Sequence, residues 1–137
     1  MKNVVLISCV KSKNSNKSIA SELYTSPLFK YNMAYAKKIG ADNVYILSAL
    51  YGVLKLDEEI EPYEKTLNNM HKPERLRWSM KVLSQLKELE ALDNTKFTIL
   101  AGVKYREYIL PYLKEYSIPF EGLALGEQLK KLKELTS

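Results

Sequence analysis

The sequence has only one cysteine and one histidine, Cys9 and His71, among 137 residues. A single cysteine cannot form an internal disulfide, and the pair supplies too few ligands for a structural zinc site. No apolar stretch approaches the roughly 20 residues that a membrane-spanning helix needs. The first apolar run is not preceded by the charged leader of a signal peptide. We therefore expect a cytoplasmic protein without a bound metal or a membrane span.

Glycine and proline are also sparse, with five residues of each, which excludes disordered and fibrous classes. The length fits one compact domain, so we expect residues 1–137 to form a single domain. The net charge of +5 is compatible with phosphate-rich partners. Much of the excess consists of lysines spread over predicted helix surfaces, where it could simply confer solubility.

Apolar runs and helical patterns alternate along the whole chain. We predict strands at 3–10, 43–49, 96–102 and 117–122, and helices at 26–40, 72–92, 103–116 and 126–135. This alternation predicts an α/β fold, with a parallel sheet of about four strands covered by helices on both faces.

The predicted helices carry recognisable end signals. Ser26 suits the N-cap of the first helix, and Gly40 suits the position just after its end. Pro111 is expected to bend or interrupt the third helix. The second helix is the longest, and its predicted apolar face consists of Leu76, Met80, Leu83 and Leu86.

Ligands of open α/β sheets bind at the carboxyl ends of the strands, so the residues that follow each strand are the candidates for a site. They are Ser8, Cys9, Lys11, Ser12 and Lys13 after the first strand, Ser48, Tyr51 and Gly52 after the second, Gly102, Lys104 and Tyr105 after the third, and Gly122 and Gly126 after the fourth. We expect these stretches to converge on one side of the molecule and to line a pocket there.

The segment "SCVKSK" could cradle an anion, because lysine ammonium groups, serine hydroxyls and loop amides attract phosphate. It lacks the glycines of a phosphate-binding P-loop and of a dinucleotide-binding motif, and a solvated basic loop is the alternative. Cys9 could be a nucleophile if Lys11 or Lys13 favoured its thiolate, but nothing in the sequence places the single histidine nearby, so we favour a half-buried structural cysteine.

Two further segments bring aromatic and acidic groups. In "ELYTSPLF", Tyr24 could stack on a base or direct its hydroxyl into the site. In "LDEEIEPYEKTL", Asp57 or a nearby glutamate could act as an acid or base, with Tyr63 close behind in the sequence. The alternative for these carboxylates is a solvated loop.

Five stretches resemble a small uncharacterised domain family of bacteria, archaea and phages: "ISCVKSK", "LYTSPLFKYNMAYA", "YILSALYGVLKLDEEIEPYEKTL", "ILAGVKYREYILPYL" and "FEGLALGEQLKKLKE". The third stretch is also distantly similar to the YaaA peroxide-stress family. A weaker similarity links Cys9, Lys11 or Lys13, Tyr24 and Ser26 to the archaeosine synthase motif, in a domain that resembles uracil-DNA glycosylase. That motif ends in a histidine where this chain has Phe29 or Lys30, so its chemistry is not carried over.

These resemblances imply a three-layer Rossmann-like, uracil-DNA glycosylase-like domain whose partner is a nucleotide, nucleoside or nucleic acid. We expect no cofactor. Two hypotheses follow. One is an enzyme that cleaves or modifies a nucleobase or nucleoside, with Tyr51 or Tyr24 stacked on the base, Lys11 and Lys13 on phosphate, and Asp57 activating water. The other is a non-catalytic binding or adaptor module in stress response or phage conflict. The sequence does not decide between them.

Overall fold

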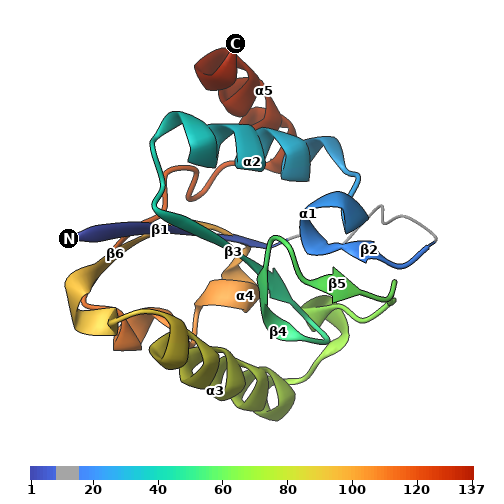
Figure 1. Cartoon of the computed structure of the whole chain (residues 1–137), viewed down its shortest axis with the longest axis vertical. Coiled ribbons are helices and arrows are strands. Elements are labelled where there is room, and N and C mark those ends of the chain that lie inside the picture. Colours follow the sequence, from blue (N-terminus) through green and yellow to red (C-terminus); the bar gives the residue numbers. More distant parts are fainter. Residues whose placement is uncertain (9–15) are drawn as a thin grey trace.

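The central sheet has five strands in the order β4-β3-β1-β6-β7, and all neighbouring pairs except β3 and β4 are parallel. A computed structural model describes residues 1–8 and 16–137 (Figure 1). The strands of this sheet are β1 (Lys2–Ser8), β3 (Asn43–Ser48), β4 (Gly52–Lys55), β6 (Thr95–Leu100) and β7 (Glu115–Ser117). A separate antiparallel pair is formed by β2 (Ser18–Ile19) and β5 (Glu59–Ile60).

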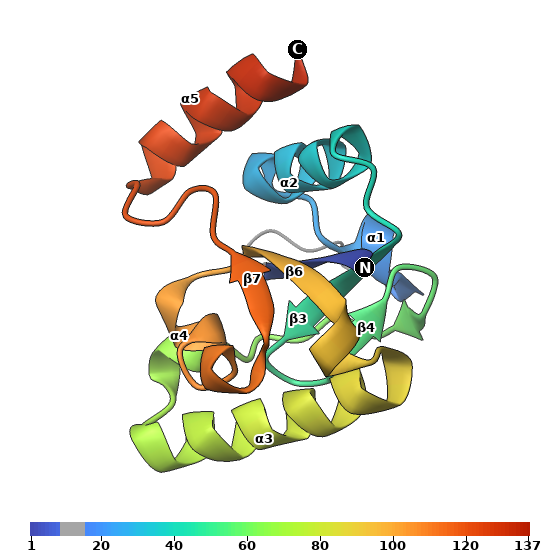
Figure 2. The same ribbon diagram turned by 90° about the vertical axis from the view of Figure 1, so that its left-hand side faces the viewer.

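Within the described residues, five α-helices cover the sheet on both faces (Figures 1 and 2). The helices α1 (Ala20–Leu23), α2 (Pro27–Lys38) and α5 (Leu125–Thr136) lie on one side, and α3 (Lys72–Leu89) and α4 (Val103–Arg106) lie on the other. Three short 3₁₀ helices, η1 (Leu67–Asn69), η2 (Leu92–Asn94) and η3 (Leu110–Tyr112), connect these elements.

Alternation along β1 explains why the sheet needs two helical layers. Val5 and Ile7 belong to the core beneath α2, whereas Val4 and Leu6 belong to the core beneath α3, and all four are at most 1% exposed. A central parallel strand buried on both faces is expected to be apolar, and the buried stretch 4–7 of β1 is.

The end signals of α2 are confirmed. The Ser26 hydroxyl accepts a hydrogen bond from the Phe29 amide at 3.2 Å, which caps the first turn. Gly40 has a φ of +72°, the left-handed conformation that ends many helices.

In the central sheet the sequence-based prediction missed one strand and misplaced another, and it also missed the short pair formed by β2 and β5. We predicted that the second strand ends at residue 49 and that residues 52–55 belong to a loop. In the structure Gly52 reverses the chain direction, and β4 pairs antiparallel with β3. The last strand, β7, lies at Glu115–Ser117 and not at 117–122. Its early start shortens the predicted helix at 103–116, which the structure divides into α4 and η3. Pro111 lies in η3, consistent with its missing amide proton.

The predicted apolar face of α3 was wrong in its first half. Leu76 and Met80 are 37% and 41% exposed, and Trp78 and Val82 are buried in their place. Leu83 and Leu86 are buried as predicted. Among the described helices, none has the length and apolar character needed to cross a membrane.

Candidate functional site

Ser8, Ser48 and Gly102 lie at the same edge of the sheet. The strands that end near them are parallel neighbours, and Ile7 of β1 is opposite both Ile46 of β3 and Leu100 of β6. The Arg106 guanidinium lies 3.9 Å from the Glu121 carboxylate, next to Gly122. This ion pair links the segment after β6 to the segment after β7, so we call this side of the sheet the carboxyl edge.

The turn between β3 and β4 is built around the Ser48 hydroxyl. Its oxygen accepts hydrogen bonds from the backbone amides of Leu50 at 3.3 Å and Tyr51 at 3.0 Å. Gly52 then adopts a φ of +78°, a conformation that glycine reaches without strain. These contacts fix Tyr51 at the rim of the carboxyl edge.

A chain of three hydroxyl groups runs inward from this turn. The Ser48 hydroxyl donates to the Tyr63 hydroxyl at 2.8 Å, and the Tyr63 and Tyr24 hydroxyl oxygens are 2.5 Å apart. Ser48 already accepts two amide protons, so its single proton is available for Tyr63. Tyr63 accepts that proton, and either hydroxyl can supply the proton of the short contact between Tyr63 and Tyr24. Because each hydroxyl in such a chain polarises the next, the hydrogen bonds strengthen one another.

The segments that carry these tyrosines are joined by backbone hydrogen bonds. The amides of Ala20 and Ser21 in α1 donate to the carbonyls of Glu58 and Leu56 at 2.7 and 2.9 Å. This connection places residue 24 beside residue 63, although 39 positions separate them in the sequence.

The tyrosine rings differ in their access to solvent. Tyr51 and Tyr63 are half-buried and meet edge to face, with centroids 5.6 Å apart. Tyr24 is only 2% exposed and packs against Phe29 at 5.3 Å. Tyr51 and Tyr63 can therefore offer ring surface to a ligand, whereas Tyr24 contributes to the hydroxyl chain.

Three side chains of α3 form hydrogen bonds with the backbone of the turn between β3 and β4, and we did not predict them from the sequence. The Trp78 indole donates to the Ser48 carbonyl at 2.9 Å, and the Lys81 ammonium donates to the Leu50 carbonyl at 3.3 Å. Gln85 accepts from the Val53 amide at 2.8 Å and donates to the Tyr51 carbonyl at 3.2 Å. The signal in the sequence is their spacing of three and four residues, which places them along one side of the helix.

The other predicted site residues are distributed differently. Asp57 is exposed, as are the neighbouring acids Glu58, Glu59 and Glu61. Tyr105 has a buried ring packed edge to face on Trp78 at 5.5 Å, and Gly102 and Lys104 are exposed at the start of α4. Cys9, Lys11, Ser12 and Lys13 lie outside the described residues.

The model of a family of unknown function, DUF6884, matches residues 4–134. The chain belongs to this family. No curated protein and no solved structure is significantly similar to it. The DUF6884 match includes the whole carboxyl edge, so the hydroxyl chain and the turn that carries Tyr51 lie inside the family's domain.

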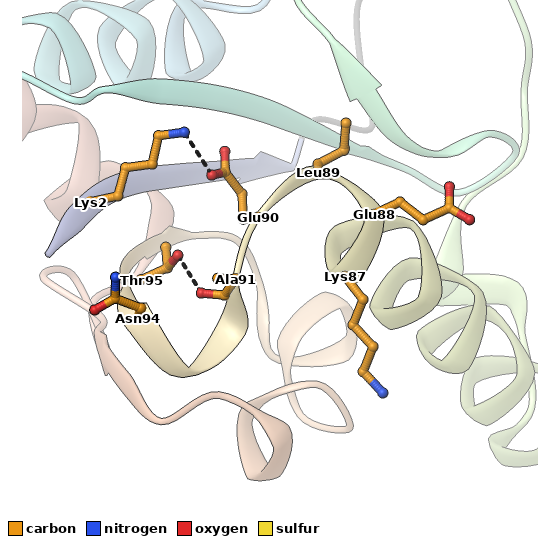
Figure 3. A pocket seen from close by; sticks show the side chains of 8 residues that line it. All are labelled: Lys2, Lys87, Glu88, Leu89, Glu90, Ala91, Asn94 and Thr95. Carbon is orange, nitrogen blue, oxygen red and sulfur yellow. Dashed lines mark hydrogen bonds and ion pairs between the residues drawn. The ribbon is translucent and has the colours of Figure 1, made fainter.

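This DUF6884 chain also has a hollow at the opposite edge of the sheet. It has a volume of about 410 Å³ (Figure 3). It is lined by Lys2, Lys87, Glu88, Leu89, Glu90, Ala91, Asn94 and Thr95. Figure 3 shows Lys2 pointing toward Glu90, whereas Lys87 points away from it.

Glu90 is the central charged group of that hollow, and its carboxylate is engaged on both oxygens. Lys2 lies 3.0 Å from one oxygen, and the Tyr45 hydroxyl and Asn43 amide donate to the other at 2.7 and 2.6 Å. Burial alone would raise the pKa of Glu90, but these hydrogen bonds and the Lys2 charge outweigh it, so the pKa is lowered. Burial and the nearby carboxylate raise the pKa of Tyr45. These contacts join β1, β3 and the end of α3, so we assign the cluster a structural role.

The described part of the chain contains no group of three or more histidine, cysteine, aspartate or glutamate side chains placed to hold a metal ion.

Proposed function

We propose that this protein binds a nucleotide or a nucleic-acid element at the carboxyl edge of its sheet. The observation that carries the proposal is the gathering of Ser48, Tyr51 and Tyr63 beside Ser8, the last residue of β1. The lysines of the segment "SCVKSK" follow Ser8 directly in the sequence.

These groups suit the two parts of a nucleotide. Half-buried tyrosine rings offer apolar faces on which a base can stack, and hydroxyl groups can form hydrogen bonds with base edges or a sugar. Lysines such as Lys11 and Lys13 supply the positive charge that a phosphate requires.

The strand order supports the carboxyl edge as the binding side of the sheet. The parallel strands follow the order β3-β1-β6-β7, so the chain moves outward in both directions from the β1–β6 pair. The segment after β1 leads to α1 and α2 on one face, and the segment after β6 leads to α4 on the other. Doubly wound sheets bind ligands at such a switch point. We infer a Rossmann-like fold, and a nucleobase-containing ligand is also what the sequence resemblances to YaaA and to uracil-DNA glycosylase-like domains would imply.

The geometry supports binding better than catalysis. The enzyme hypothesis needs a carboxylate or a thiolate inside the pocket. Asp57 and its acidic neighbours are exposed, and Cys9 lies outside the described residues. The proposal therefore assigns a binding role and no reaction.

Thermal-shift measurements test the proposal, because a ligand that binds only the folded protein raises the melting temperature. Nucleotides, nucleosides and short DNA and RNA strands would be tested separately. We expect at least one of them to stabilise the wild-type protein, and we expect Tyr51→Ala and Lys11→Ala to reduce that shift.

Two exposed residues away from the proposed site provide matched controls. Tyr112→Ala removes a tyrosine that is 56% exposed in η3, and Lys114→Ala removes an exposed lysine that precedes β7. Both controls should retain the full shift. If no nucleotide, nucleoside or strand raises the melting temperature, or if the site variants match the controls, the proposal is wrong.

A further inference from the structure

The outer helical layer formed by α2 and α5 is strongly basic. The two helices pack against each other on the same side of the sheet, with α5 outermost (Figure 2). Together they contain six lysines and two glutamates, a net charge of +4, while the whole chain carries +5. The six residues are Lys30, Lys37, Lys38, Lys130, Lys131 and Lys133, and we call them the lysine layer.

The charges of the lysine layer are available to a partner. All six residues are exposed, and within residues 1–8 and 16–137 none of them forms an ion pair with a carboxylate. Lys38 donates to the carbonyl of Leu135, and Lys131 lies over the Phe120 ring at 5.9 Å. Neither contact neutralises the ammonium charge.

The opposite face of the molecule is also basic, but there acidic residues lie in the same helix as the basic ones and one arginine is paired. There α3 has a net charge of +3, from five basic and two acidic residues. One of its arginines, Arg75, is paired with Glu107 at 3.3 Å and stacks near Tyr108. The helix α2 has no acidic residue at all.

The spacing of the lysines fits an extended anion better than a small one. At about 1.5 Å per helical residue, Lys30 and Lys38 are about 12 Å apart along α2. A single phosphate cannot contact both ends of such a row. Phosphates of one nucleic-acid strand recur about every 3.4 Å along the helix axis, so a strand crossing the layer meets several lysines.

We propose that the lysine layer is a second binding surface, which holds the sugar–phosphate backbone of a nucleic acid through electrostatic attraction. It differs from the carboxyl-edge group in the elements that form it, because its six lysines belong to α2 and α5, whereas Ser48, Tyr51 and Tyr63 belong to β3 and the segments that follow it. A lysine layer of this length favours a nucleic-acid polymer as the partner. The carboxyl edge alone would suit a free nucleotide and a polymer equally well.

The test is the salt dependence of binding to labelled single-stranded DNA, duplex DNA and RNA, measured by fluorescence anisotropy. The layer variant replaces Lys30, Lys37, Lys130 and Lys133 with glutamine. The control variant replaces the exposed lysines Lys72, Lys87, Lys96 and Lys114 with glutamine. Both variants have a net charge of +1, because each loses four charges from +5.

For the wild-type protein we expect binding that weakens steeply with salt. Each lost phosphate contact should lower the slope of log K against log salt by about one. For the layer variant, the plot of log K against log salt should therefore be less steep by up to about four units. This variant should also bind more than tenfold more weakly at low salt. The control variant should stay close to the wild-type protein.

Several results would overturn the proposal. Equal losses in both variants would show that binding follows net charge alone, and unchanged binding in the layer variant would show that the layer does not contact the polymer. Absence of binding to all three nucleic acids would also overturn it. Binding to phosphatidylserine vesicles in place of nucleic acid, lost in the layer variant, would identify a membrane surface as the partner.

A failure of the lysine-layer proposal can be distinguished from a failure of the proposed binding at the carboxyl edge. The layer variant should keep the thermal shift produced by a mononucleotide, because the carboxyl edge is intact. Conversely, Tyr51→Ala should keep the salt slope with an oligonucleotide, because the lysine layer is intact.

Discussion

At the scale of single residues, Gly52 is constrained in two independent ways. Its φ of +78° lies in the left-handed region that favours glycine. A Cβ atom at this position would also stand 2.2 Å from the Oε1 atom of Gln85. Gln85 uses that oxygen to accept the Val53 amide, so the glycine allows the close contact that fixes the turn.

Gly40 makes it possible to separate these two constraints. Its φ is +72°, but a Cβ there would meet no atom within 4 Å. We expect Gly40→Ala to lower the free energy of unfolding by about 1 kcal/mol, the usual cost of a left-handed alanine. Gly52→Ala should cost about 2 kcal/mol more, because Gln85 must move and two hydrogen bonds weaken. Urea denaturation of both variants measures the difference. Equal losses would mean that Gln85 moves aside without consequence.

At the scale of elements, α3 shows why a periodic pattern can be read on the wrong face. Leu76 and Met80 have the right spacing for a buried stripe, yet they are exposed, and Trp78 and Val82 point inward. Both sets share the helical period, so the sequence alone leaves the rotation of the helix open. The rotation is settled by contacts with distant residues, such as the hydrogen bond between Trp78 and the Ser48 carbonyl.

That hydrogen bond leads to a prediction about Trp78→Phe. The variant keeps an aromatic ring but leaves the buried Ser48 carbonyl without the indole proton and creates a small void. We expect the free energy of unfolding to fall by about 2 kcal/mol. Met80→Ala on the exposed face is the control, and it should change stability by less than about 0.5 kcal/mol. Comparable losses in the two variants, measured by urea denaturation, would contradict the observed rotation of α3.

The candidate site was predictable only in part. Ser48, Tyr51 and Gly52 stood out because they follow a buried strand, and a parallel sheet places strand ends at one edge. The sequence could not show that Tyr24 would be buried and would meet Tyr63, because their contact depends on the pairing of α1 with residues 56–58. The supporting role of Gln85 was hidden for the same reason.

At the scale of the whole molecule, the alternation of strands and helices predicted the layered α/β arrangement but not the edges of its sheet. Inner strands such as β1 contain a continuous apolar stretch and are easy to recognise. The edge strands β4 and β7 have four and three residues, and such short segments carry little periodic signal. The antiparallel direction of β4 depends on one backbone angle at Gly52, which the composition of the segment does not reveal.

The Glu90 cluster joins β1, β3 and the end of α3 at the edge of the sheet opposite the carboxyl edge. It makes the stability of the molecule depend on pH. The pKa of Glu90 is lowered from its ordinary value of 4.5, so in acid the unfolded chain binds the proton more readily than the folded protein. The cluster therefore stabilises the fold above pH 4.5, and this contribution is lost as the pH falls through the lowered pKa. The pKa of Tyr45 is raised above its ordinary value of 10.0, so its contribution is lost above that pH, where the unfolded chain ionises first.

Glu90→Gln tests this assignment, because it keeps the size of the side chain and removes its charge. At neutral pH we expect a loss of about 2 kcal/mol, since Lys2, Tyr45 and Asn43 lose hydrogen bonds to a charged acceptor. Below pH 4.5 the gap between the variant and the wild-type protein should narrow, because protonation removes the same charge from Glu90. The control Glu88→Gln alters an exposed neighbour in α3, so it should leave the curve of unfolding free energy against pH almost unchanged. A constant gap at every pH would show that Glu90 acts through packing and not through its charge.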